Sequence, residues 1–87
     1  MSKLNNEDIE LRNKITQRLI DLRESTGLSQ SDFAKLHDID RQQVNRWESF
    51  ESERGVTIYT IKRFCNLLKI TLQDFFNDPL FNNSDKN

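Results

Sequence analysis

A short segment of the chain gathers amide and guanidinium side chains on one face of an expected helix. These side chains are Arg41, Gln42, Asn45 and Arg46. At helical spacing, Val44 and Trp47 point the opposite way into an apolar interior, so the polar side chains must face outward. Arginine can bond guanine O6 and N7, and glutamine or asparagine can bond adenine N6 and N7. This face is therefore a candidate for contact with base edges in duplex DNA.

Two short helices, expected over residues 30–37 and 41–49, would hold this face in place. The link 38–40 between them is only about three residues long, which forces the sharp turn and large crossing angle of a helix-turn-helix. Ala34 lies where the two helices approach most closely, and Ile39 fills the turn.

Apolar periodicity and capping residues predict three further helices around this pair. They are expected over 7–25, capped by Asn6 and ended by Gly27; over 58–68, capped by Thr57; and over 72–77, opened by a Thr71–Asp74 capping box and stopped by Pro79. Their expected buried residues are Leu11, Ile15, Leu19, Leu22, Ile58, Ile61, Phe64, Cys65 and Leu68. Because alternating runs of β-branched and aromatic residues are missing, we expect an all-α fold, a compact bundle of five short helices.

Length and composition narrow the classes of protein further. The 87 residues suffice for one small domain, expected over 7–77, with a flexible N-terminus at 1–6 and a partly disordered tail at 78–87. A single cysteine and a single histidine argue against a disulfide, a metal site or a cofactor. The chain lacks an apolar run long enough for a membrane span or a signal peptide, so we expect a cytoplasmic protein.

Two segments carry a resemblance to a known family. LSQSDFAK at 28–35 resembles the opening of the lambda-repressor/Cro-like (XRE) helix-turn-helix domain, and IDRQQVNRWE at 39–48 resembles its recognition helix. With LIDLR at 19–23 and the stretch 61–76, the resemblance covers about residues 12–76, most of the chain. It implies a compact lambda-repressor-like fold that binds DNA through the second helix of the pair.

The resemblance also implies roles for individual residues. Gln30 would touch a phosphate, and Gln43 a phosphate or a base. The residues that would enter the major groove are Arg41, Gln42, Asn45 and Arg46. Arg23 and Glu48 would form a partly buried structural ion pair between the first and third helices.

The chain departs from the family pattern at several positions. Asp38 stands where the family usually has glycine, so we expect a left-handed aspartate with some strain. His37 replaces an aliphatic residue, and we interpret it as a half-buried packing residue rather than a pH switch. In the loop after the third helix, Glu51 and Glu53 would repel phosphate and leave Arg54 as the local donor.

These observations favour sequence-specific binding of double-stranded DNA by a small transcriptional regulator, most simply a repressor. The apolar residues Phe75, Phe76, Leu80 and Phe81 could close the core, or could form a homodimer through the C-terminal helix and tail; we expect the homodimer. The alternative function is a protein-interaction module without DNA binding, which the net charge of −1 keeps open. An enzyme is disfavoured because no nucleophile is paired with a base and no phosphate loop is present.

Overall fold

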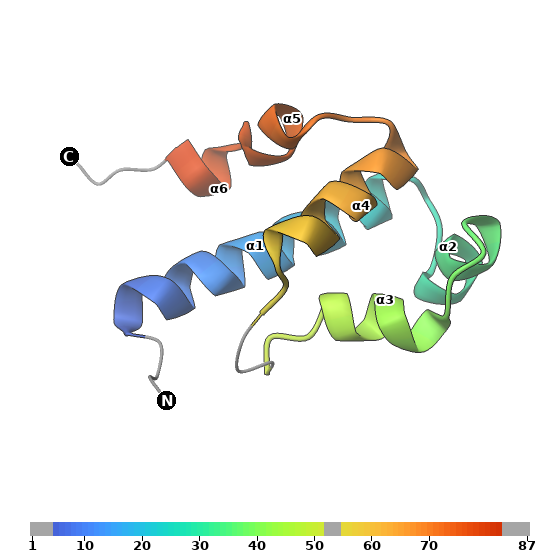
Figure 1. Cartoon of the computed structure of the whole chain (residues 1–87), viewed down its shortest axis with the longest axis horizontal. Helices are drawn as coiled ribbons and strands as arrows, with labels where there is room; N and C mark the ends of the chain where they lie inside the picture. Colours follow the sequence, from blue (N-terminus) through green and yellow to red (C-terminus); the bar gives the residue numbers. More distant parts are fainter. Residues whose placement is uncertain (1–4, 52–54, 83–87) are drawn as a thin grey trace. The chain divides into compact units, whose positions relative to one another are not determined.

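A computed structural model describes residues 5–51 and 55–82. Within these ranges the elements are six helices and no strand, which confirms the predicted all-α class. They are α1 (Asn6–Ser25), α2 (Gln30–Leu36), α3 (Arg41–Trp47), α4 (Ile58–Leu68), α5 (Leu72–Phe76) and α6 (Pro79–Asn82) (Figure 1). The chain divides into two compact units, Met1–Gly55 and Val56–Asn87.

Helix α1 begins the first unit, and its capping residue differs from the predicted one. The side chain of Asn5, not Asn6, accepts a hydrogen bond from the Asp8 amide. Leu19 is fully buried as expected, but Leu11 is 49% exposed, so its place in the buried stripe was wrong. Within this unit, the 20-residue α1 is about 30 Å long whereas α2 and α3, of 7 residues each, reach about 10 Å. The two short helices α2 and α3 cannot cover the whole length of α1, so part of the predicted stripe of α1, including Leu11, is left exposed.

The turn between α2 and α3 has the geometry that the sequence predicted. Helix α2 ends in a Schellman arrangement, because the Ile39 amide donates to the Ala34 carbonyl (2.9 Å) and the Asp38 amide donates to the Lys35 carbonyl (3.2 Å). Asp38 at the centre of this turn is left-handed, with φ of 58°. Figure 1 shows the two helices meeting at this turn beside α1.

Capping side chains and buried side chains hold this helix pair together. Ser29 caps α2 by accepting from the Asp32 amide, and Asp40 caps α3 by accepting from the Gln42 amide. Both helices end one or two residues earlier than predicted, at Leu36 and Trp47. Their buried side chains are Phe33, Ala34, Val44 and Trp47.

Helices α4, α5 and α6 form the second unit. Thr57 caps α4, and the predicted Thr71–Asp74 capping box opens α5 with both of its hydrogen bonds present. Helix α4 buries Ile61, Phe64 and Cys65 as expected. Ile58, predicted to be buried, is 49% exposed because it is the first residue of α4, one turn before the buried stripe begins.

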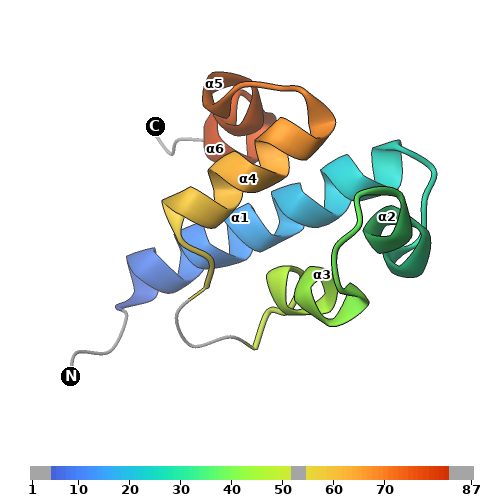
Figure 2. The same ribbon diagram turned by 45° about the vertical axis from the view of Figure 1, so that its right-hand side comes forward.

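A sixth helix, α6, was not predicted, because Pro79 was expected only to stop the helix before it. Proline suits the first position of a helix, because an N–H at that position would have no partner within the helix. Asp78, which directly precedes α6, accepts a hydrogen bond from the Leu80 amide. Figure 2 shows α6 beside α5. The ring centroids of Phe81 and Phe76 lie 5.0 Å apart. Residues 79–82 of the predicted tail are therefore helical, while 83–87 lie outside the described residues.

Two further expectations concerned the N-terminal residues and a membrane-spanning segment. Of the predicted flexible N-terminus 1–6, Asn5 and Asn6 take part in the start of α1, and residues 1–4 are not among those described. No helix in the described part of the chain combines the length and apolar character needed to cross a membrane.

Candidate nucleic-acid interface

Helix α3 separates a buried face from an exposed polar face. Val44 is 1% exposed and Trp47 is 8% exposed, so these two side chains anchor the helix. The four side chains expected to meet base edges are all exposed to solvent: Arg41, Gln42, Asn45 and Arg46. Gln43 is half-buried and so offers less of its amide to a ligand. The helix contains no acidic residue, which leaves its outer face with a positive charge and several amide groups.

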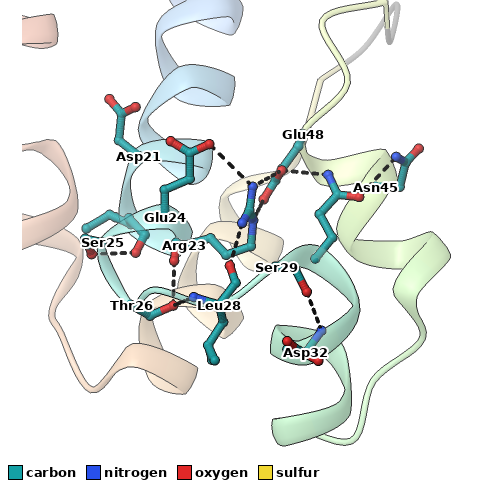
Figure 3. Close-up of polar contacts among 12 residues, drawn as sticks. Asp21, Arg23, Glu24, Ser25, Thr26, Leu28, Ser29, Asp32, Asn45 and Glu48 are labelled. Atoms are coloured by element: carbon teal, nitrogen blue, oxygen red, sulfur yellow. Dashed lines mark hydrogen bonds and ion pairs between the residues drawn. The ribbon is translucent and has the colours of Figure 1, made fainter.

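An ion pair joins the end of α1 to the end of α3. Arg23 donates from Nε to Glu48 Oε2 over 2.7 Å and from Nη2 to Glu48 Oε1 over 3.2 Å (Figure 3). The two side chains are 10% and 6% exposed, respectively. Arg23 Nη1 also donates to the Leu28 carbonyl at 2.7 Å, which ties the segment before α2 to the same group. Since Glu48 directly follows Trp47, the pair fixes where α3 ends relative to α1.

The charge state of Arg23 follows from these contacts. The hydrogen bond to Glu48 raises the pKa of Arg23, burial opposes it, and the negative charges of Glu48 and Glu24 raise it further. Glu24 Oε2 lies 3.9 Å from Arg23 Nη2. Arg23 therefore remains a guanidinium cation at any pH near neutrality.

Gln30 lies at the centre of a contact that the sequence did not reveal. Its Nε2 donates to Glu48 Oε1 over 2.8 Å, and its Oε1 accepts from Asn45 Nδ2 over 3.3 Å. The buried ion pair is thus connected through one glutamine to a side chain on the exposed face of α3. The predicted ion pair carried one signal for this contact. A carboxylate has more lone pairs than Arg23 alone fills, so a nearly buried Glu48 favours a further hydrogen-bond donor beside it.

Acidic and basic side chains are mixed around α3. Asp38, Asp40 and Glu51 are exposed, as is Lys35 on α2. The predicted loop donor Arg54 and its neighbour Glu53 lie outside the described residues. Among the described residues of this unit, the basic side chains classed as exposed are Arg41 and Arg46 on α3 and Lys35 on α2, and these can meet a phosphate backbone.

The residues weighed for other roles have the surroundings of packing residues. His37 is half-buried, with its ring centroid 4.5 Å from that of Phe33. The side chain of Cys65 is fully buried. Among the residues that the structure describes, no three or more His, Cys, Asp or Glu side chains group in a way that could hold a metal ion.

Comparison with known proteins agrees with this geometry. The family described as Cro/C1-type HTH DNA-binding domain matches residues 18–79, a span that contains α2, α3, Gln30 and the Arg23–Glu48 pair. Searches of the curated proteins and of the solved structures found no match. The family match covers more than half of the chain and agrees with the resemblance in the sequence. The chain therefore belongs to the Cro/C1-type helix-turn-helix DNA-binding domains.

Proposed function

We propose that the protein is a transcriptional repressor that inserts α3 into the major groove of duplex DNA and reads base sequence with its exposed face. The observation that carries this proposal is the division of α3 into two faces. Val44 and Trp47 are 1% and 8% exposed, whereas the four base-reading candidates all face solvent. A helix anchored in this way presents side chains of fixed register to a groove wide enough to admit it.

The exposed side chains of α3 form two groups, which differ in the base edge that they can bind. Arg41 and Arg46 carry the forked donors that fit guanine O6 and N7. Gln42 and Asn45 carry the paired acceptor and donor that fit adenine. Gln30 uses one Nε2 hydrogen on Glu48 and retains a second, which could donate to a phosphate.

Repression requires only that a bound protein occupies a promoter. A homodimer would place two copies of α3 on successive turns of the groove, about 34–36 Å apart, and would double the number of half-site contacts. We propose α5 and α6 as the dimer surface, because Phe76, Leu80 and Phe81 retain part of their apolar surface in contact with solvent. Leu80→Glu should then lower the mass measured by light scattering from dimer to monomer, and an unchanged mass would refute this surface.

Salt dependence separates DNA binding from the alternative of a protein-interaction module. Affinity for duplex DNA should fall linearly on a log–log plot against salt, with a slope of about −2 or steeper, because each neutralised phosphate contributes about −0.9. The measurement is fluorescence anisotropy of labelled duplex between low and moderate salt. Folded protein that binds no duplex at low salt would refute the proposal and favour the interaction module.

A further inference from the structure

A line of hydrogen bonds runs from the buried carboxylate of Glu48 to the exposed amide of Asn45. Glu48 accepts from Arg23 through both oxygens, at 2.7 and 3.2 Å, so the carboxylate is held in one position. An ionised carboxylate can only accept hydrogen bonds. Because Glu48 can only accept, it determines which group donates and which accepts in the hydrogen bonds to Gln30 and from there to Asn45.

The amide of Gln30 has one orientation that suits both of its neighbours. Its Nε2 faces Glu48 and donates over 2.8 Å, so its Oε1 faces Asn45 as an acceptor. Turning the Gln30 amide around would set its oxygen against the oxygen of Glu48 and its NH₂ against the NH₂ of Asn45. Both contacts would change from attractive to repulsive.

The orientation of Gln30 in turn determines that of Asn45. Because Gln30 offers an oxygen, Asn45 donates to it from Nδ2, over 3.3 Å, and its own Oδ1 is directed away. Figure 3 shows the amide nitrogen of Asn45 on the dashed bond and the oxygen on the opposite side. One hydrogen of Nδ2 is used in this bond, and the other is free to donate.

We propose that Gln30 is a positioning residue that turns the acceptor oxygen of Asn45 outward, so that Asn45 reads a base with an exocyclic amino group. In the major groove these bases are adenine, through N6, and cytosine, through N4. Guanine and thymine present acceptor oxygens there, which oppose Oδ1. Adenine fits best, because its N7 also accepts the remaining Nδ2 hydrogen. This inference rests on the proposed insertion of α3 into the major groove.

Site selection with variants tests the inference. Duplexes selected from a random pool by wild-type protein are compared with those selected by Asn45→Ala, which identifies the base pair that Asn45 reads. Wild type should prefer adenine or cytosine there by about fivefold or more, the value of a well-placed pair of hydrogen bonds. Gln30→Ala should reduce this preference to less than about twofold and leave the other positions of the motif unchanged. Asn66→Ala, at an exposed asparagine on α4, is the matched control and should change nothing.

Gln30→Met provides a second variant because it keeps the length of the side chain and removes both of its hydrogen-bonding groups. Asn45 then loses the acceptor that determines its orientation. The preference at that one base pair should fall below about twofold, as with Gln30→Ala, with folding of the variant checked by circular dichroism. A wild-type preference in the folded Gln30→Met variant would overturn the inference.

A measurement without DNA separates this inference from the function on which it rests. In ¹H–¹⁵N spectra of the free protein, Gln30→Ala should shift the side-chain amide signals of Asn45, and Asn66→Ala should not. Unchanged Asn45 signals would overturn the inference even if a DNA motif is found. A wild-type motif that Gln30→Ala weakens equally at every position would also overturn it, since a phosphate contact alone acts in that way. Failure of folded wild type to select any motif would instead overturn the proposed function, and with it the base assignment.

Discussion

Arg23 donates two hydrogen bonds to the Glu48 carboxylate, over 2.7 and 3.2 Å, and so joins α1 to the residue that follows α3. Both side chains are at most 10% exposed. An ion pair in such a position contributes modestly as a whole, because burial of both charges opposes their attraction. Loss of one partner is costly, however, since the other charge then remains buried without compensation.

Arg23→Met should therefore destabilise the protein by about 3 kcal/mol, the lower end of the range for breaking a buried pair. The double variant Arg23→Met/Glu48→Leu should recover much of that loss, because no lone charge is left behind. Urea denaturation of wild type, both single variants and the double variant gives the coupling energy. Equal stability of Arg23→Met and wild type would show that the pair does not join the helices as the structure indicates.

Trp47 anchors α3 from its buried face. Trp47→Ala should reduce the free energy of unfolding by about 3–5 kcal/mol, the usual cost of truncating a large core side chain. Thermal unfolding followed by circular dichroism measures this change. Wild-type stability of the variant would mean that the side chain does not pack in the core, and that the exposed face of α3 is assigned to the wrong residues.

Arg41 and Asn45 lie on the exposed face and should behave in the opposite way. Arg41→Ala and Asn45→Ala should each change the free energy of unfolding by less than about 0.5 kcal/mol, as expected for surface positions. Each should cost about 1–3 kcal/mol in specific DNA binding. Anisotropy titrations on a selected duplex and unfolding curves on the same samples give both values. Loss of stability comparable to that of Trp47→Ala would contradict the assignment of this face.

Asp38 holds a left-handed conformation, with φ of 58°, in the turn between α2 and α3. That conformation costs an L-residue about 1–2 kcal/mol, whereas glycine adopts it freely and loses about 0.5–1 kcal/mol in chain entropy. Asp38→Gly should therefore raise stability by about 0.5–1 kcal/mol. Asp38→Ala is the control and should lower the melting temperature. A fall in melting temperature with glycine would show that the aspartate side chain itself stabilises the turn.

The helix-turn-helix could be predicted from the sequence because its determinants are local. Ser29 and Asp40 are capping residues at fixed positions, and the short link between α2 and α3 leaves the chain little freedom. The turn at Asp38 could be predicted because only a few backbone conformations can end one helix and begin another within a few residues. Such features depend on neighbours within a few residues.

Other features depend on neighbours that the sequence does not reveal. Leu11 and Ile58 have the correct periodicity, but each lies in the first two turns of its helix, and periodicity does not reveal which turns are covered. Helix α6 was missed because a proline that ends one helix can also begin the next. The contact of Gln30 with Glu48 and Asn45 joins residues that are 18 and 15 positions apart, and only the packed structure brings them together.

Selection of binding sites from random duplex DNA tests the central claim most directly. The purified protein and its Arg41→Ala/Asn45→Ala variant are both shown to be folded and are then carried through the same selection. The account predicts an enriched motif for wild type that the variant does not enrich, and a palindromic motif would also support the homodimer. If folded wild type enriches nothing at low salt, or if the variant enriches the same motif, then the exposed face of α3 does not read bases.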